Sequence, residues 1–167
     1  ANTDCLIANI SFVSNNVATS LFHIKGYSIV FAENISVVSN IKTESSGNLL
    51  EMSGLNEVKI SSFNFTNILG YSGKEYLVHF WNCSDVVISH IEISQNKMQF
   101  LIVEYSNINI TSLKGLNIYV FLWISIQNSL VFMENALFQG FDNSKTFASA
   151  SSSDVNCNLT TIYVFNS

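Results

Sequence analysis

The chain reads LFHIKG at residues 21–26, LLEMSG at residues 49–54 and LVHFWN at residues 77–82. Successive stretches start 28 positions apart, and each is largely apolar and ends in Gly or Asn, residues that turn a chain at low conformational cost. A repeat of this length is typical of solenoids, in which each repeat stacks on the next to bury its apolar face. It therefore predicts a stack of coils of about 28 residues.

Apolar columns continue from these stretches in the same register. The columns are Val30, Val58 and Val86; Ile35, Phe63 and Ile91; and Val37, Phe65 and Ile93. A polar column of Ser36, Asn64 and Glu92 lies between them, and Asn40 and Asn96 occupy equivalent turns two periods apart. This alternation is the period of β-strands with one buried face.

Further copies follow at shorter spacing. Residues 100–106 predict a fourth copy, whose register is open by one residue, residues 119–127 a fifth and residues 161–166 a sixth. Residues 7–11 echo residues 31–36, which predicts a partial coil before the first full one. The predicted fold is all-β: a parallel β-helix of about 5–6 coils of between 21 and 28 residues. It should be right-handed, as connections between parallel strands generally are.

A helical solenoid and an antiparallel sandwich are the alternatives to this fold. A helical solenoid requires apolar residues at positions i, i+3, i+4 and i+7. Here they alternate instead, and Asn and Ser, which disfavour helix interiors, recur every few residues. An antiparallel sandwich explains the strands and turns, but not a 28-residue register held across three copies.

Residues 141–158 interrupt the repeat with the Ser-rich segment FDNSKTFASASSSDVNCN. The sequence predicts that residues 1–167 form a single β-helix segment, with a loop insertion at 141–158 that projects from one corner. Insertions of this kind in solenoids often carry binding sites. A tolerated surface loop is the plainer interpretation.

The coil length, the stacked aliphatic columns and the Asn or Gly at corners resemble the pectate-lyase-like, right-handed parallel β-helix superfamily. The resemblance covers residues 5–140 and 159–167. Enzymes of this superfamily cleave acidic polysaccharides, and the resemblance would imply Asn-Thr-Asp, Asp-Asp, Gly-His-Gly and Arg-x-Lys segments in a hydrolase, or an Arg base with Asp-bound calcium in a lyase. The last three of these segments do not occur, and the chain has no Arg. We therefore expect no catalytic residues, no cofactor and no enzymatic activity.

Two polar groups are the remaining candidates for chemistry. Glu57 and Asp85 occupy the same repeat position, but a solvated acidic patch is more plausible than the pair of carboxylates, about 5–10 Å apart, that a glycosidase requires. His23, Glu51 and His79 form another column, with a spacing of about 4.8 Å. Because a flat ladder does not converge on a metal ion, we expect no metal site and instead a pairing of Glu51 with one or both imidazoles.

Three cysteines, Cys5, Cys83 and Cys157, match no metal-binding spacing. Cys5 and Cys83 lie at least two coils apart, beyond the roughly 7 Å between Cα atoms that a disulfide can span. Cys157 lies in the predicted loop, from which it could reach a neighbour. Free thiols are the simplest expectation.

Six Asn-x-Ser/Thr sequons predict N-linked glycans as partners of the chain. They are at Asn9, Asn34, Asn64, Asn82, Asn109 and Asn158. Asn34, Asn64 and Asn109 should point outward, and Asn9 matches Asn34 by local alignment. Asn82 lies at a corner, where it could instead join an internal ladder of asparagines.

Composition limits the remaining partners. Charged residues make up only 11% of the chain and the net charge is −5, with seven scattered Lys, so nucleic acid and anionic membranes are unlikely partners. The most apolar segment, residues 116–133, is interrupted by polar residues and predicts no membrane span. No signal peptide is visible and the chain does not begin with Met, as expected for a mature fragment or part of a longer protein.

Three classes of function remain open. The leading hypothesis is a structural extracellular glycoprotein, a β-solenoid segment of a surface coat, adhesin or fibre at the cell surface. Neither end shows a polar cap, so self-association through the solenoid ends, or continuation of the solenoid, is expected. A carbohydrate- or receptor-binding module, using residues 141–158 and aromatics such as Trp81, is the second hypothesis, and a polysaccharide lyase or hydrolase is the third. The lack of Arg and Pro suggests an AT-rich coding source, which ciliated protists fit.

Overall fold

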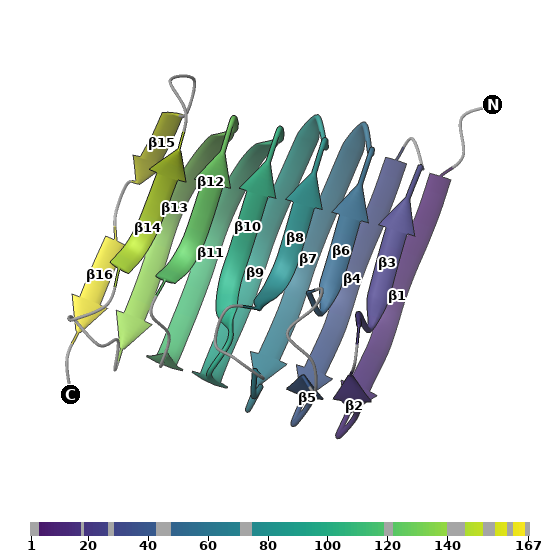
Figure 1. Ribbon diagram of the computed structural model, residues 1–167, viewed down its shortest axis with the longest axis vertical. Coiled ribbons are helices and arrows are strands. Elements are labelled where there is room, and N and C mark those ends of the chain that lie inside the picture. Colours follow the sequence, from purple (N-terminus) through teal and green to yellow (C-terminus); the bar gives the residue numbers. More distant parts are fainter. Residues whose placement is uncertain are drawn as a thin grey trace.

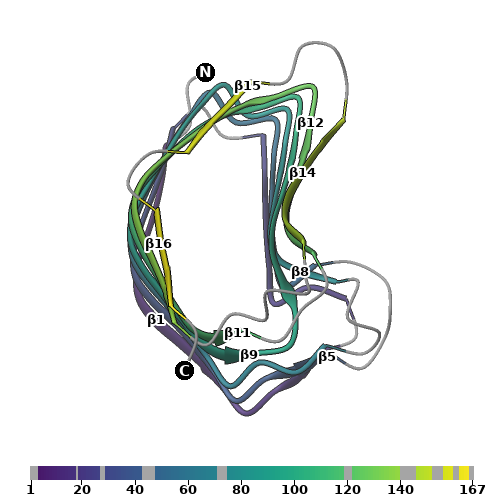
Figure 2. The same cartoon turned by 90° about the vertical axis from the view of Figure 1, so that its left-hand side faces the viewer.

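The computed structural model describes residues 4–17, 19–26, 29–42, 48–70, 75–118, 122–139, 146–151, 156–159 and 162–165. Within these residues the protein is an all-β solenoid, wound through parallel strands in a right-handed coil of about five turns (Figure 1, Figure 2). Figure 2 views the coil along its axis and shows a long curved wall that faces a shorter, straighter one. The predicted parallel β-helix is therefore confirmed.

Two parallel sheets form these walls. The first sheet consists, in spatial order, of β1 (Asp4–Val13), β4 (Ile29–Val38), β7 (Glu57–Thr66), β9 (Asp85–Asn96), β11 (Asn107–Ile118), β13 (Leu130–Gln139) and β15 (Asn156–Leu159), with β16 (Ile162–Phe165) also paired to β13. The second sheet consists of β3 (Phe22–Lys25), β6 (Leu50–Ser53), β8 (Tyr76–Trp81), β10 (Gln99–Glu104), β12 (Leu122–Gln127) and β14 (Thr146–Ser151). A small third sheet pairs β2 (Asn16–Val17) with β5 (Ile41–Lys42).

Equivalent residues of successive coils stack in columns. One column of the first sheet runs through Cys5, Val30, Val58, Val86, Ile108, Val131 and Cys157. Its steps are 25, 28, 28, 22, 23 and 26 residues, so the 28-residue register is confirmed for the middle coils. The expected shortening after Asn96 is also confirmed, and the fourth copy has the register that pairs Leu101 with Val78.

Most of the change in coil length occurs at one corner, between the first sheet and the second. β7 ends at Thr66 and β8 begins at Tyr76, whereas β9 ends at Asn96 and β10 already begins at Gln99. The longer coils form an excursion at this corner, and β5 lies within it (Figure 2). Length can vary there because the excursion lies outside the two large sheets, although β2 and β5 pair within it.

Residues with a left-handed backbone mark the corners, and they also stack in columns. The first column holds Asn9, Asn34, Ser62, His90, Ser112 and Asn135. The second holds Ser14, Ser39, Asn67, Gln95 and Asn117, and the third holds Gly26, Gly54, Asn82, Tyr105 and Asn128. Gly and Asn tolerate a positive φ best, and each such residue redirects the chain without breaking the hydrogen-bonded ladders on either side.

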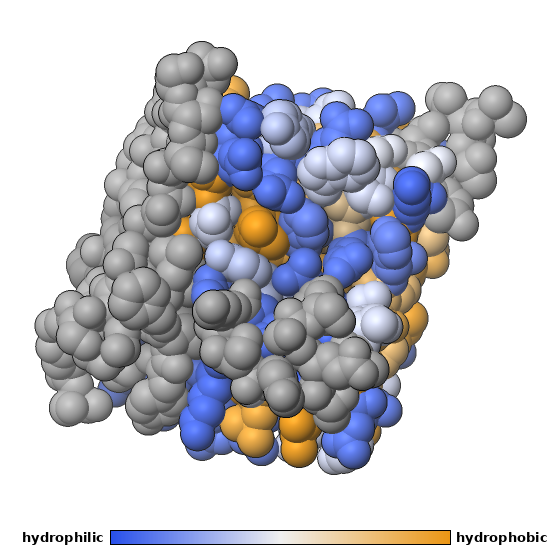
Figure 3. Space-filling view, viewed as in Figure 1, coloured by the Kyte–Doolittle hydropathy of each residue, from blue (hydrophilic) through white to orange (hydrophobic). Residues whose placement is uncertain are grey.

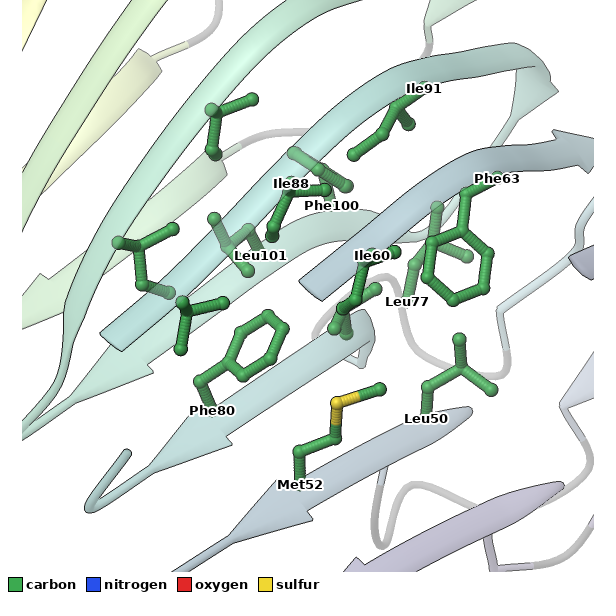
Figure 4. Close-up of a cluster of buried hydrophobic side chains, with 14 of the residues drawn as sticks. Leu50, Met52, Ile60, Phe63, Leu77, Phe80, Ile88, Ile91, Phe100 and Leu101 are labelled. Atoms are coloured by element: carbon green, nitrogen blue, oxygen red, sulfur yellow. The ribbon is translucent and has the colours of Figure 1, made fainter. Parts of the chain in front are cut away.

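The interior is filled by side chains from the two large sheets. Ile60 and Phe63 on β7 face Leu50 and Met52 on β6 across the coil, and Phe80 on β8 extends the same cluster (Figure 4). All five are buried, and full burial of such a side chain stabilises the fold by about 1.5–3 kcal/mol.

Buried polar side chains satisfy the backbone where the corners leave it unpaired. Asn40 is fully buried, and its Nδ2 donates to the carbonyl oxygens of Phe12 and Val38, at 2.9 Å each, while its Oδ1 accepts from Asn15. At the third corner, the hydroxyl of Ser106 accepts from the backbone N–H of Cys83 at 2.9 Å and donates to the carbonyl of Glu104. These ladders fix the coil-to-coil register at two of the three corners.

The prediction of a sixth copy of the second-sheet strand at residues 161–166 is wrong. Residues 162–165, within the copy predicted at 161–166, form β16, which pairs with β13 of the first sheet rather than with β12 of the second. The apolar alternation that suggested this copy is the same for strands of either sheet. It indicates which face of the strand is buried, but not which of the two sheets the strand belongs to.

The segment predicted as a loop insertion at 141–158 instead contains two strands among its described residues. Thr146–Ser151 (β14) pairs with β12, and Asn156–Leu159 (β15) pairs with β13. Ala148 and Ala150 continue two apolar columns, because they pair with Ile124 and Ile126, but alanine gives a weak apolar signal in a Ser-rich stretch. The repeat therefore continues where the composition suggested a break.

Replacement of Gly54 tests the left-handed corner. Gly54 has a φ of +64°, and a β-carbon built there would meet nothing within 4 Å, so any loss in Gly54→Ala comes from backbone strain alone. We expect this variant to lower the free energy of unfolding by about 1 kcal/mol in urea denaturation. Gly54→Asn should lose clearly less, because Asn82 occupies the same corner on the next coil at a φ of 53°. Equal losses in both variants would contradict the assignment.

Candidate functional site

The outward face of the second sheet holds a group of titratable side chains that the repeat brings together. His23, Glu51 and His79 lie on β3, β6 and β8 and are paired rung by rung, as the sequence predicted. Hydrophilic side chains predominate over these strands on the face seen in Figure 3. The ladder is therefore an outer-surface feature.

The partners of this ladder differ from the prediction. Oε1 of Glu51 accepts a hydrogen bond from the backbone N–H of Asn48 at 3.0 Å, and neither imidazole pairs with it among the described residues. Nε2 of His79 lies instead 2.9 Å from Oε2 of Glu104. Glu104 is the outward residue two positions beyond Ile102, which follows His79 in the ladder. Because Ile102 offers no polar group, the imidazole turns diagonally to the carboxylate.

Glu104 also influences Tyr76 at the start of β8. Burial raises the pKa of the Tyr76 hydroxyl above its usual value, and the negative charge of Glu104 acts in the same direction, whereas a hydrogen bond with Ser125 opposes them. His79, Glu104, Tyr76 and Ser125 therefore form a polar network across β8, β10 and β12. The sequence did not predict the contact of Glu104 with His79, because the register of the fourth copy was ambiguous by one residue.

A shallow, open depression lies beside this network. It is lined by His23, Lys25, Glu51, Met52, Ser53, His79 and Trp81. Trp81 is 45% exposed, so its indole offers an apolar surface next to the polar side chains. An exposed aromatic ring flanked by carboxylate and imidazole groups can stack on the apolar face of a sugar and bind its hydroxyls. The covered part of the Trp81 ring is also consistent with structural packing, the interpretation that the sequence favours for this residue.

The ladder is not accompanied by a metal-binding cluster in the part of the chain that the structure describes, where no three His, Cys, Asp or Glu side chains converge. His90 lies apart, exposed at a left-handed corner of the first sheet. The described side chains of this face offer hydrogen-bonding groups and an exposed aromatic ring.

The carboxylate pair proposed from the repeat lies on the outer face of the first sheet. Glu57 and Asp85 are paired residues of β7 and β9, as predicted, and Glu57 forms an ion pair with Lys59 on its own strand. The chain also carries one hydrolase-like triplet that the sequence reading overlooked, Asn-Thr-Asp at residues 2–4. Its Asp4 is exposed at the start of β1 and is paired with Ile29, so the neighbouring strand offers it no second carboxylate.

The described sequon asparagines all lie on the outside of the coil. Asn9, Asn34, Asn64, Asn82 and Asn109 are exposed. Asn158 lies on β15, and its side chain is outside the described residues. The predicted corner position of Asn82 is confirmed, and the alternative of an internal asparagine ladder is wrong for it, because it is exposed with a left-handed backbone. Asn15 and Asn40 form such a ladder at another corner.

The cysteines occupy three different settings. Cys5 is partly exposed at the edge strand β1 and Cys83 is buried, and both are free thiols. Cys157, expected in a loop, lies in β15 in the same column as Cys5. Burial raises the pKa of the Cys83 thiol above its usual value, although hydrogen bonds with the backbone of Leu55 and Trp81 act in the opposite direction.

Comparison with known proteins adds no family to this picture. The chain matches no protein-family model, and no curated protein matches it in sequence. The described part of the chain contains no helix of the length and apolarity that a bilayer crossing requires. The functional argument therefore depends on the solenoid surface itself.

The raised thiol pKa predicts that Cys83 makes stability depend on pH under alkaline conditions. A folded-state pKa above the unfolded value gives stability that is fully present below the unfolded pKa and is lost as the pH rises through the folded pKa. We expect the free energy of unfolding to fall from about pH 8.5 upward, and to fall less steeply in Cys83→Ser. Serine suits this site, because Ser106 and Ser129 follow in the same column. Parallel pH profiles for the two proteins, measured by urea unfolding, would exclude this role of Cys83.

Proposed function

We propose that this chain is a structural extracellular glycoprotein, a non-catalytic β-solenoid segment of a surface coat, adhesin or fibre, built like the pectate-lyase-like right-handed β-helices. The observation that carries the proposal is that five of its six sequon asparagines are exposed on the outer wall of a coil whose interior is filled by apolar side chains. Glycans attached there would project from the wall without disturbing the core. They would also add polarity to a chain with few charges.

The sequons are not equivalent in this proposal. Asn64 accepts a hydrogen bond from the hydroxyl of Thr66, the sequon's own threonine, at 2.9 Å, and none of the described groups bonds to its Nδ2. Asn34, in contrast, donates from Nδ2 to Oδ1 of Asn9 at 3.0 Å. These two asparagines lie on adjacent rungs, about 4.8 Å apart, so two glycans would collide. We therefore favour Asn64 and Asn109, with at most one glycan on the Asn9 and Asn34 pair.

Self-association through the solenoid edges is the second part of the proposal. β1 is a ten-residue edge strand with Asp4 as its single charged residue. Natural edge strands usually prevent pairing with charges, proline or short length, and β1 uses little of this protection. A strand of this kind favours the addition of a further strand, as expected for a fibre or coat.

The glycan assignment predicts a mass change in protein secreted from a eukaryotic host. Treatment with an N-glycosidase should lower the intact mass, and Asn64→Gln and Asn109→Gln should each remove the mass of one glycan. Asn107→Gln is the matched control, because Asn107 is exposed on the same face as Asn109 but is not in a sequon. A wild-type mass that the glycosidase leaves unchanged would reject the glycoprotein proposal.

A carbohydrate-binding module is the second candidate, favoured by the exposed Trp81 beside His79 and Glu51. We expect chitohexaose, a neutral hydroxyl-rich sugar, to bind weakly in calorimetric titration, and Trp81→Ala to abolish the signal because stacking on the indole is lost. Phe31→Ala, which removes an exposed ring from the first sheet, is the control and should bind as wild type does. Equal binding by all three proteins would exclude the Trp81 surface as the site.

A further inference from the structure

The outward column of the first sheet that contains Asn109 is rich in exposed apolar side chains. In spatial order it runs through Leu6, Phe31, Lys59, Val87, Asn109 and Phe132. Its four apolar members are between 40% and 73% exposed. Val87 and Phe132 are the residues paired with Asn109, one on each side. This sequon asparagine therefore lies between two exposed apolar side chains.

A shallow depression surrounds Asn109 on this wall. Asp85, Val87, Asn107 and Phe132 line it together with Asn109 itself. Phe132 and Val87 supply apolar surface, whereas Asp85 and Asn107 supply hydrogen-bonding groups. An aromatic ring beside such groups suits a sugar, because the ring covers the apolar C–H face while the polar groups bind the hydroxyls.

The ring of Phe132 is open, unlike the other exposed ring of this column. The ammonium group of Lys59 lies over the ring of Phe31, 5.5 Å from its centroid. Among the residues that the structure describes, no cationic or aromatic side chain stacks on Phe132 in the same way. Its ring face is therefore accessible to a group attached at Asn109.

We propose that the first N-acetylglucosamine of a glycan on Asn109 lies in this depression, with the C–H face of the sugar on Phe132 and its acetamide group against Val87. The inference rests on the glycosylation in the proposed function and names one site where the glycan packs on the wall. The attachment replaces the bond from C1 of the sugar to a lipid diphosphate donor with a bond to Nδ2 of Asn109, which gives up one proton.

The register of the parallel strands permits this contact. Paired residues of adjacent strands lie about 4.8 Å apart, and their side chains leave the same face of the sheet. Asn109 and Phe132 are such a pair. Because the sugar is covalently held beside the ring, its effective concentration there is high, and weak stacking is enough to keep it in place. Covering the exposed apolar surface should stabilise the folded state.

Asn64 provides a comparison on the same wall. Its paired residues are Ser36 and Glu92, and Glu92 forms an ion pair with Lys114 at 3.1 Å. A glycan on Asn64 would meet polar side chains and no aromatic ring at either paired position. We therefore expect the sugars on Asn64 and Asn109 to differ in their surroundings and in their effect on stability.

Nuclear magnetic resonance of the full chain tests the inference. The protein would be secreted from a eukaryotic host as the Asn158→Gln variant, because Asn158 is a second sequon asparagine paired with Phe132. An endoglycosidase would trim each glycan to a single N-acetylglucosamine. The C–H protons of the sugar on Asn109 should be shifted upfield by the ring of Phe132, and those on Asn64 should not. Phe132→Leu should remove the shift.

The matched control is Phe31→Leu, which removes the other exposed ring of the column, three rungs from Asn109. The upfield shift should persist in this variant. Retention of the shift in Phe132→Leu, or its loss in Phe31→Leu, would show that another group is responsible.

Urea unfolding supplies a second measurement through a double-mutant cycle of Thr111→Ala and Phe132→Leu. Thr111→Ala removes the sequon but leaves Asn109 in place. Loss of the glycan should raise the equilibrium constant for unfolding roughly three- to tenfold when Phe132 is present, because apolar surface is uncovered. The increase should be clearly smaller in the Phe132→Leu background, and the cycle subtracts the effects that each substitution has alone.

A glycan on Asn109 whose proton signals match those on Asn64, or whose loss has the same effect with and without Phe132→Leu, would overturn the inference and leave the proposed function standing. Glycans on other sequons but none on Asn109 would also overturn it, because the depression would lack its occupant. A chain with no glycan at any sequon would instead reject the glycoprotein proposal itself, by the mass measurement alone.

Discussion

The in-register stacking of inward residues is the constraint on which the rest of the molecule depends. Each coil must place an apolar side chain directly over the one before it, so Val30, Val58 and Val86 are linked even though 28 positions separate each pair. A slip of one residue would turn every inward side chain of that strand toward water. The coil therefore changes length between the strands of the two large sheets, and mostly at the excursion between the first sheet and the second.

The left-handed corners make this stacking possible and also shape the surface. Each corner turns the chain at one residue, so the strands on either side keep their ladders while the sheet bends. The same geometry places Asn9, Asn34 and Asn82 on the outside at positive φ. The corners therefore provide some of the exposed asparagines on which the glycoprotein proposal depends, and the third corner also brings Glu104 next to the buried Ser106.

The sequence predicted the middle coils well, because Val, Ile and Phe mark the inward columns strongly there. It placed the His23, Glu51 and His79 ladder correctly, since their spacing follows the same register. It failed where the apolar signal is weak or does not distinguish the two sheets. The alanines of β14 gave too weak a signal to predict a strand, and the alternation in β16 is compatible with either sheet. The sequence also could not predict that His79 pairs with Glu104, because Glu104 is a diagonal neighbour of His79 and does not lie in its column.

The distance between two outward residues of one column tests the stacked coil most directly. Spin labels at Ser36→Cys and Glu92→Cys, in a chain whose native cysteines are replaced by serine, would lie two strands apart on the outer wall. The account predicts a backbone separation of about 10 Å and strong dipolar broadening in frozen solution. A doubly labelled spectrum identical to the sum of the two singly labelled spectra would contradict the in-register solenoid.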